Sequence, residues 1–399
     1  MRSSSRVVAI LVSALAVSAA VLAIAAEIRP VNLAGLTVHE WGTFTSIAGD
    51  DGMAVTWEAL GGPADLPCFV HRFEYGAKAN LSGTVRMETP VIYLYGPKAS
   101  TAGVHVSFPN GFITEWYPKA NRVASYFGSG IPPRGPDVRQ PRKNEPDSIE
   151  WTAVRLGPVS DPPDFPLEQP PSHYYAARST DAAPLLAGDE NERFLFYRGV
   201  GQFQPPIAAR ADAGDRIVAR SLVKERIPAS ILFENNDGRI SWRVQGPIDR
   251  EVTLEAPQTA AGIAVLRAEM ERILVSQGLF PKEARAMVKT WGDSWFEEGT
   301  RLFYFLPTSA VDPILPMEIR PAPARVVRVF VGRMEIFTPE KKRAIRDAVA
   351  RGDSSPFAKY GRFLEPVFAN MGPGPWDAQL SRMRQEYFNR ETACKGGGW

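Results

Sequence analysis

The chain has 399 residues, of which 44% are hydrophobic and 23% are charged, so it can bury hydrophobic cores and lacks the composition of a disordered protein. Lysine and arginine number 46 against 44 aspartate and glutamate residues, a formal net charge of +2. This near balance, with only short basic clusters, argues against a nucleic-acid partner and against attraction to an anionic membrane surface. At about 150 residues per domain, the length predicts two or three domains.

Residues 1–26 predict a secretory signal peptide. Arg2 and Arg6 precede an uninterrupted run of apolar and small residues at 7–26, and positions 23–25 provide an A-x-A cleavage pattern. The run is also long enough to span a bilayer as an uncleaved N-terminal anchor, in which case the membrane is a partner through this segment alone. Either way the remainder is expected to be exported, to the periplasm or the extracellular space, because the positive charges stay on the cytoplasmic side.

The chain contains two cysteines, Cys68 and Cys394. In an oxidising compartment an even number of cysteines permits one disulfide, here between the end of the chain and its N-terminal part. The alternative is two unpaired thiols. Sequence does not give the Cα separation that a disulfide requires, so both alternatives stand.

Residues 27–256 are predicted to form a β-sandwich-like domain. Alternating apolar residues at 104–108 lead to Asn110-Gly111, a pair typical of a hairpin turn, and a second strand is expected at 112–117. Another hairpin is expected at 231–244, around a turn of the sequence NNDG. Further strands are expected at 36–45, 85–95, 149–156, 193–198, 216–222 and 251–254. Short strands without intervening helices favour an antiparallel sandwich.

The segment 132–171 is unusually rich in proline. Proline lacks the N–H group that a regular strand ladder requires, so most of this segment cannot form strands. It is therefore expected to form long surface connections on either side of one strand.

Residues 257–399 are predicted to form a helical hairpin followed by a mixed α/β part, which makes the whole chain α+β. Apolar residues recur at helical spacing over 265–274, and Gly278 is suited to a C-terminal cap. Pro281 suits the first turn of a second, antiparallel helix that is expected to extend to 299. The later elements are expected to be strands at 301–306 and 326–337 and helices at 338–350, 357–368 and 377–388.

Trp291, Trp295 and Phe296 invite comparison with an aromatic binding platform. Their spacing of four and five residues is also what a core-facing stripe of a helix produces. We therefore expect Met287, Trp291 and Trp295 to pack the second helix against the sheet.

Four strings in the sequence resemble a family of uncharacterised exported bacterial proteins. They are HEWGTFT at 39–45, METPVIY at 87–93, HYYAAR at 173–178, and KTW followed by SWFEEG within 289–299. The resemblance extends over nearly the whole chain after the signal peptide. It implies bacterial origin, export and one continuous architecture, and it implies no activity, because none is established for the family.

His39 and Glu40 are the first candidate catalytic residues. Adjacent side chains on a regular strand point to opposite faces, so these two are not expected to bind one ion together. Trp41 shares the face of His39, whereas apolar residues share the face of Glu40 unless Gly42 introduces a bulge. A structural ion pair, for instance with an arginine, or a hydrogen bond at the end of the strand explains such a glutamate. The functional alternative is an acid or base with a raised pKa in a cleft.

The four histidines, His39, His71, His105 and His173, show no metal-binding spacing. A metal site would have to be assembled from separate strands and loops. His39, His173 and Glu88 form the best three-ligand set, of the kind that leaves a coordination position of a divalent metal such as zinc open for catalysis. Hydrogen-bonded structural histidines are the alternative, and no cofactor is certain.

Five residues are candidates for ligand binding: Trp41, Tyr174, Tyr175, Glu297 and Glu298. The two tyrosines directly follow the proline-rich segment, where loops on a rigid sheet often carry function. The two glutamates occupy a predicted last helical turn, where negative charge opposes the helix dipole by about 0.3 to 1 kcal/mol unless a neighbouring arginine offsets it. Sequences tend to break local rules where function requires it.

Two functions from different classes follow. The first is an exported binding or structural module that recognises an envelope or extracellular partner. The second is a metal-assisted hydrolase in which His39, His173 and an acidic residue polarise water and substrate. The sequence has no recognised catalytic motif, which favours the first. Convergence of His39, Glu88 and His173 on one pocket would favour the second.

Overall fold

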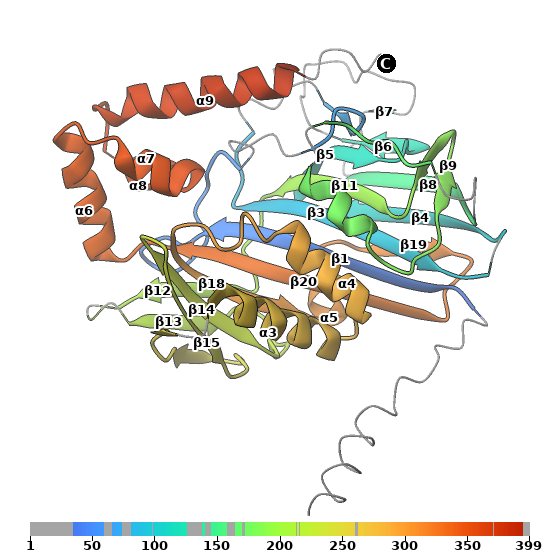
Figure 1. The fold of residues 1–399 in the computed structure, drawn as a ribbon, viewed down its shortest axis with the longest axis horizontal. Coiled ribbons are helices and arrows are strands. Elements are labelled where there is room, and N and C mark those ends of the chain that lie inside the picture. Colours follow the sequence, from blue (N-terminus) through green and yellow to red (C-terminus); the bar gives the residue numbers. More distant parts are fainter. Residues whose placement is uncertain are drawn as a thin grey trace, which may run out of the picture.

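The computed structural model describes residues 35–59, 66–73, 81–97, 99–125, 138–139, 145–157, 164–169, 172–212, 214, 216–259, 262–369 and 371–393. These residues form an α+β fold in which a ten-stranded sheet packs against a seven-stranded sheet, with helices on the other face of the larger sheet (Figure 1). The predicted signal peptide and Cys394 lie outside the described residues. Cys68 is disulfide-bonded. Among the helices of the described part, none is long and apolar enough to cross a membrane.

The ten-stranded sheet forms the centre of the molecule. Its strands in spatial order are β17 (Gln258–Thr259), β15 (Arg239–Gln245), β14 (Ser230–Asn236), β18 (Gly299–Leu306), β20 (Arg325–Ile336), β1 (Thr37–Ile47), β3 (Val85–Tyr95), β11 (Leu195–Gly201), β5 (Gly111–Tyr117) and β2 (His71–Arg72).

Two further sheets complete the β-structure. The seven-stranded sheet contains β10 (Glu190–Glu192), β9 (Leu185–Ala187), β8 (Asp147–Leu156), β4 (Thr101–Phe108) and β19 (Met317–Arg320), with β6 (Arg122–Ala124) and β7 (Val138–Arg139) attached beside β8. A three-stranded sheet contains β12 (Ile207–Ala211), β13 (Ile217–Ser221) and β16 (Glu251–Thr253).

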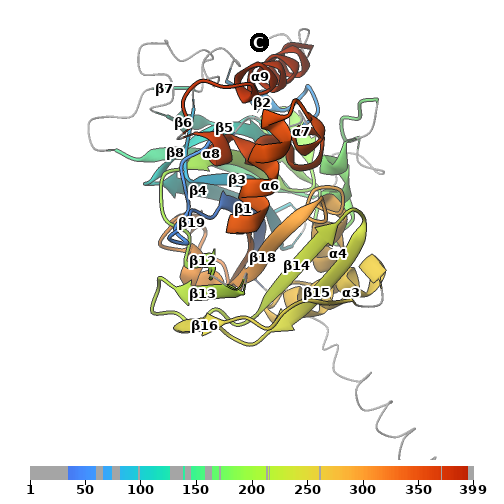
Figure 2. The same cartoon turned by 90° about the vertical axis from the view of Figure 1, so that its left-hand side faces the viewer.

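Helices cover the outer face of the ten-stranded sheet in two groups. The first is η1 (His173–Arg178), α3 (Gly262–Ser276) and α4 (Pro281–Thr290). The second is α6 (Pro339–Ala350), α7 (Ser355–Tyr360), η2 (Gly361–Leu364) and α8 (Glu365–Phe368), and α9 (Trp376–Ala393) follows it in the chain. The short helix α5 (Thr308–Val311) follows β18 and belongs to neither group. Figure 2 shows the second group above the three-stranded sheet. Each group has its own hydrophobic core on the sheet, so two apolar patches share one face.

The ten-stranded sheet joins the two predicted parts of the chain. Its middle strand β1 pairs in parallel with β20 and antiparallel with β3. The predicted boundary at 256/257 falls between β16 and β17, and strands from both sides of it alternate within the same sheet. The predicted β-sandwich-like domain and the predicted C-terminal domain therefore share one sheet and form one continuous architecture.

The predicted hairpin at Asn110-Gly111 is wrong, although both strands exist. β4 pairs with β8 and β19 in the seven-stranded sheet, whereas β5 pairs with β11 and β2 in the ten-stranded sheet. Val106 of β4 and Ile113 of β5 lie in the same core between the sheets. The turn therefore carries the chain from the seven-stranded sheet to the ten-stranded sheet. The apolar side chains of β4 and β5 are buried in the core between the two sheets, so the two strands need not hydrogen-bond to each other.

The other predicted hairpin is confirmed. β14 and β15 pair antiparallel from Ser230↔Gln245 to Asn236↔Arg239. The two turn residues, Asp237 and Gly238, have φ values of 53° and 80°. Positive φ at both central residues is what a tight type I′ turn requires, and aspartate-glycine is a sequence that tolerates it.

The predicted helical hairpin is also confirmed, but its second helix ends earlier than expected, at Thr290. Arg301 donates hydrogen bonds to the carbonyl oxygens of Trp295 and Glu298, both at 2.7 Å. These contacts satisfy carbonyl groups in the turns after the helix and place positive charge beside them. The predicted helix at 357–368 is divided into α7, η2 and α8, and Gly361, the first residue of η2, has a φ of 48°.

Candidate functional site

His39 lies in a buried hydrogen-bond network beneath α4. Its side chain is fully buried, and Nδ1 lies 2.7 Å from Oε2 of Glu283. Glu283 also accepts hydrogen bonds of 2.7 Å from the Tyr95 hydroxyl and from the backbone N–H of Phe280. A carboxylate in the first turn of a helix is favoured by the helix dipole. The network therefore fastens the start of α4 to β1.

Glu40 points to the other face of the sheet, as the strand alternation predicts. Its carboxylate accepts hydrogen bonds of 2.6 Å from Arg328 Nε and 2.6 Å from the Tyr197 hydroxyl. Burial acts to lower the pKa of Arg328, but Glu40, Tyr197 and Asp312 together outweigh burial and raise it. Of the two structural explanations expected for Glu40, the ion pair is thus confirmed, and its partner is Arg328.

His173 begins the short helix η1, packed against α4. Its Nδ1 lies 3.1 Å from Oδ2 of Asp293, and its ring centre lies 5.5 Å from that of Trp291. Trp291 is 1% exposed, which confirms the core interpretation of the tryptophan stripe.

Tyr174 and Tyr175 surround an ion pair. Tyr174 is buried, and its hydroxyl donates to Glu192 at 3.1 Å. Arg178 donates to Glu192 at 2.9 and 2.7 Å, and its guanidinium lies 4.8 Å from the centre of the Tyr175 ring. Both tyrosines therefore support a buried carboxylate.

The remaining predicted binding residues lie in three places. Trp41 is fully buried among core side chains such as Tyr93. Glu298 accepts a hydrogen bond of 2.9 Å from the backbone N–H of Asp237 in the β14–β15 turn. Glu297 Oε2 lies 2.8 Å from Arg333 Nη2 and belongs to a charged cluster that the sequence analysis did not find.

The proposed metal ligands are not brought together. His39 is bound to Glu283, His173 lies beside Asp293, and Glu88 lies among arginines. Within the described ranges, no group of three histidine, cysteine, aspartate or glutamate side chains is placed to hold a metal ion. The metal-assisted hydrolase hypothesis therefore has no arrangement of these three residues to support it.

We call the cluster around Glu88 the arginine cluster. It lies on the outer face of the ten-stranded sheet, between the two helix groups. Its members are five arginines and three glutamates: Arg86, Arg198, Arg301, Arg333, Arg362, Glu88, Glu297 and Glu335. The contacts include Arg333 Nε to Glu335 Oε1 at 2.8 Å, Arg301 Nε to the same oxygen at 3.1 Å and Arg362 Nη2 to Glu88 Oε1 at 3.4 Å.

The electrostatics of the arginine cluster are dominated by burial and by the arginines. Burial acts to raise the pKa of Glu88, but the neighbouring arginines, of which Arg86 and Arg362 contribute most, together outweigh it and hold that pKa at about 2. Burial lowers the pKa of Arg301 to about 10; Glu335 opposes this decrease and Arg333 adds to it. Glu88 is therefore ionised at neutral pH.

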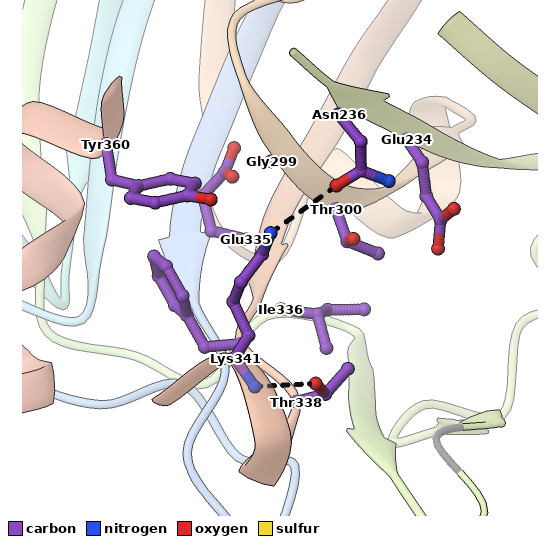
Figure 3. A pocket seen from close by; sticks show the side chains of 10 residues that line it. Glu234, Asn236, Gly299, Thr300, Glu335, Ile336, Thr338, Lys341 and Tyr360 are labelled. Atoms are coloured by element: carbon purple, nitrogen blue, oxygen red, sulfur yellow. Dashed lines mark hydrogen bonds between the residues drawn. The ribbon is translucent and has the colours of Figure 1, made fainter. Parts of the chain in front are cut away.

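A small cavity opens beside the arginine cluster, between α6 and the ends of β14, β18 and β20 (Figure 3). Its volume is about 180 Å³, and its polar lining includes Glu234, Asn236, Thr300, Thr338, Lys341 and Tyr360. We call it the Lys341 cavity. Gly299, with a φ of 125°, and Glu335 also line it, and a Cβ atom at Gly299 would lie 3.1 Å from Arg301 Nη2. The absence of a side chain there brings the cavity to the edge of the arginine cluster.

Lys341 and Glu234 bring charges of opposite sign to the Lys341 cavity, whereas the third charged side chain of its lining, Glu335, is paired with Arg301 and Arg333. Lys341 Nζ lies 3.5 Å from Asn236 Oδ1 and 5.6 Å from the centre of the Tyr360 ring, as Figure 3 shows for the asparagine. Burial raises the pKa of Glu234, and the charge of Lys341 opposes that increase. No ion pair joins these two described side chains, and the side chains that hydrogen-bond to them, Ser241 to Glu234 and Asn236 to Lys341, are uncharged.

Comparisons with known proteins give little further information. No family model matches the chain, and no curated protein matches it. The yeast delta-COP-I mu-homology domain complexed with a Dsl1 WxWxV peptide is similar over 76% of this chain and 96% of that chain, at 8% identity and a TM-score of 0.28. The same yeast domain in a second structure gives 8% identity, the same coverages and a TM-score of 0.26. Similarity at this level carries no argument about function.

Proposed function

We propose that this chain is an exported binding module that holds a small zwitterionic ligand, with one carboxylate and one ammonium group, in the Lys341 cavity. One observation carries the proposal: Lys341 and Glu234 line the same cavity without pairing with each other. The lysine ammonium would bind the ligand carboxylate, and the glutamate would bind the ligand ammonium. Charge-assisted hydrogen bonds of this kind are about twice as strong as neutral ones.

The size and lining of the cavity limit the ligand further. A volume of about 180 Å³ is below the range of about 300 to 1,000 Å³ that holds drug-sized molecules. Asn236, Thr300 and Tyr360 add amide and hydroxyl groups that can fix the orientation of a polar compound. A compound of the size of one amino acid fits this description.

Isothermal titration calorimetry with free amino acids, their N-acetyl derivatives and their amides tests the proposal. We expect at least one free amino acid to bind, and each derivative to bind at least about tenfold more weakly because it lacks one charge. Lys341→Met and Glu234→Gln should each abolish this binding. Lys289→Met, which changes an exposed lysine on α4, is the matched control.

Two results would overturn the assignment. One is that no free amino acid binds to a folded protein. The other is binding that survives both Lys341→Met and Glu234→Gln, because the ligand would then occupy another part of the molecule.

A further inference from the structure

Arg86 on β3 is a buried cation without hydrogen-bond acceptors. Its side chain is fully buried, and none of its three side-chain nitrogens has a hydrogen-bond partner. The carboxylate of Glu88 approaches only to 3.8 Å from Nε, which is beyond hydrogen-bond distance. A guanidinium group buried without acceptors is strongly unfavourable. A group that accepts its hydrogen bonds is therefore expected at this place.

Two unpartnered hydroxyl groups lie beside Arg86. Thr45 of β1 is directly opposite Arg86 of β3 and, on its other side, directly opposite Arg333 of β20. Residues opposite each other in paired strands share one face of the sheet. The hydroxyls of Thr45 and of Thr43, two residues earlier, are buried and have no hydrogen-bond partner. The guanidinium of Arg86 and both hydroxyls thus lie on the same buried face.

The charges around this place do not balance among the described residues. Arg198 has Glu115 as its direct neighbour on β5. The other four guanidinium groups of the arginine cluster, including Arg362 from η2, are accompanied by three carboxylates, Glu88, Glu297 and Glu335. One positive charge is left over, and Arg86 is the arginine that lacks hydrogen bonds. A buried water molecule would satisfy its N–H groups but would leave this charge uncompensated.

We propose that Arg86 and Thr45 bind a small monovalent anion of the halide class, such as chloride, between the sheet and the C-terminal helices. The anion accepts N–H hydrogen bonds from Arg86 and an O–H hydrogen bond from Thr45, and its charge compensates the excess arginine. Complete burial of both side chains limits the ligand to a single small ion. This site is separate from the Lys341 cavity, so either proposal can fail without the other.

Thermal unfolding in sodium chloride and in sodium gluconate at matched ionic strength tests the proposal. We expect Tm to rise with the logarithm of the chloride concentration above the dissociation constant and not with gluconate, because only a ligand of the folded state stabilises it by mass action. Thr45→Val should weaken the apparent chloride affinity by about tenfold or more. Thr290→Val is the matched control, since the buried Thr290 hydroxyl donates to the Ala286 carbonyl 2.8 Å away, in α4. An identical response to both salts, or an unchanged response in Thr45→Val, would overturn the proposal.

Crystals of the unmodified protein grown in sodium bromide provide a second test that requires no variant to fold. We expect an anomalous bromide peak within hydrogen-bond distance of the Arg86 guanidinium, and its loss in Arg86→Met where that variant crystallises. Water at this position, or bromide found only on the protein surface, would contradict the assignment.

Discussion

At the scale of single residues, the most distinctive feature of this molecule is its set of buried charged side chains. The need of Glu40 for an arginine could be predicted from its apolar neighbours, but which arginine could not, because Arg328 is 288 positions away in the sequence. The arginine cluster was missed, although a local signal exists. Arg86-x-Glu88 and Arg333-x-Glu335 each place an arginine and a glutamate on one face of a strand. Two such pairs, each in a largely apolar strand, indicate a cluster of buried charged side chains.

Removal of Arg328 should be strongly destabilising. Arg328→Met leaves Glu40 buried without its cation, and breaking one side of a buried pair costs about 3 to 5 kcal/mol. Urea unfolding should show this decrease in the free energy of unfolding, and the double variant Glu40→Gln/Arg328→Met should recover part of it. A decrease below about 1 kcal/mol in the single variant would show that the pair is not the main stabilising contact of Glu40.

Glu88 should make the stability of the protein sensitive to acid. Its pKa is about 2 in the folded protein, against an ordinary value of 4.5. The stabilisation is therefore present above pH 4.5 and is lost as the pH falls from 4.5 towards 2, by an amount on the order of 3 kcal/mol. Unfolding measured across this range should give a shallower pH dependence for Glu88→Gln than for the unmodified protein. Equal pH dependence in the two proteins would contradict the assignment.

At the scale of elements, the helices and their caps could be predicted, because each depends on one segment of the chain. The pairing of strands could not be predicted, because it depends on two segments. The apolar periodicity after 262 and the proline at 281 located α3 and α4, and Thr338 caps α6 by accepting a hydrogen bond from the backbone N–H of Lys341. The choice of strand partner is a property of the whole fold. Asn110-Gly111 therefore predicted a turn correctly but gave the wrong partner for β4.

The attachment of α4 to the sheet should depend on Trp291. This side chain is 1% exposed within the core of the first helix group, so Trp291→Ala should reduce the free energy of unfolding by about 3 to 5 kcal/mol. Val275→Ala on α3, where the valine is 39% exposed, is the control and should change it by less than about 0.5 kcal/mol. An unchanged Tm in a soluble Trp291→Ala variant would mean that the stripe contributes little to packing.

At the scale of the whole molecule, the α+β class followed from the sequence, whereas the continuity of the central sheet did not. Composition and periodicity change near position 257, and this change suggested a domain boundary. Hydrogen bonding between β1 and β20 crosses that boundary. Local patterns do not record which distant segments pair, so this continuity could be found only in three dimensions.

Export remains a prediction that protein chemistry can test. The small residues at 23–25 predict cleavage, so the mature chain should begin at Ala26 or Glu27 and be recovered outside the cytoplasm. N-terminal sequencing of the native protein is the measurement. Recovery of Met1 would instead favour a membrane anchor.

The parallel pairing of β1 with β20 also has a kinetic consequence. The central strand of the sheet cannot obtain one of its two neighbours until nearly 300 further residues have become available, since Glu40 and Arg328 are 288 positions apart. Contacts of such long range make folding slow, and in the meantime a strand that is buried in the folded protein keeps an open edge. Chains that are only partly synthesised would therefore depend on protection against aggregation until β20 is available.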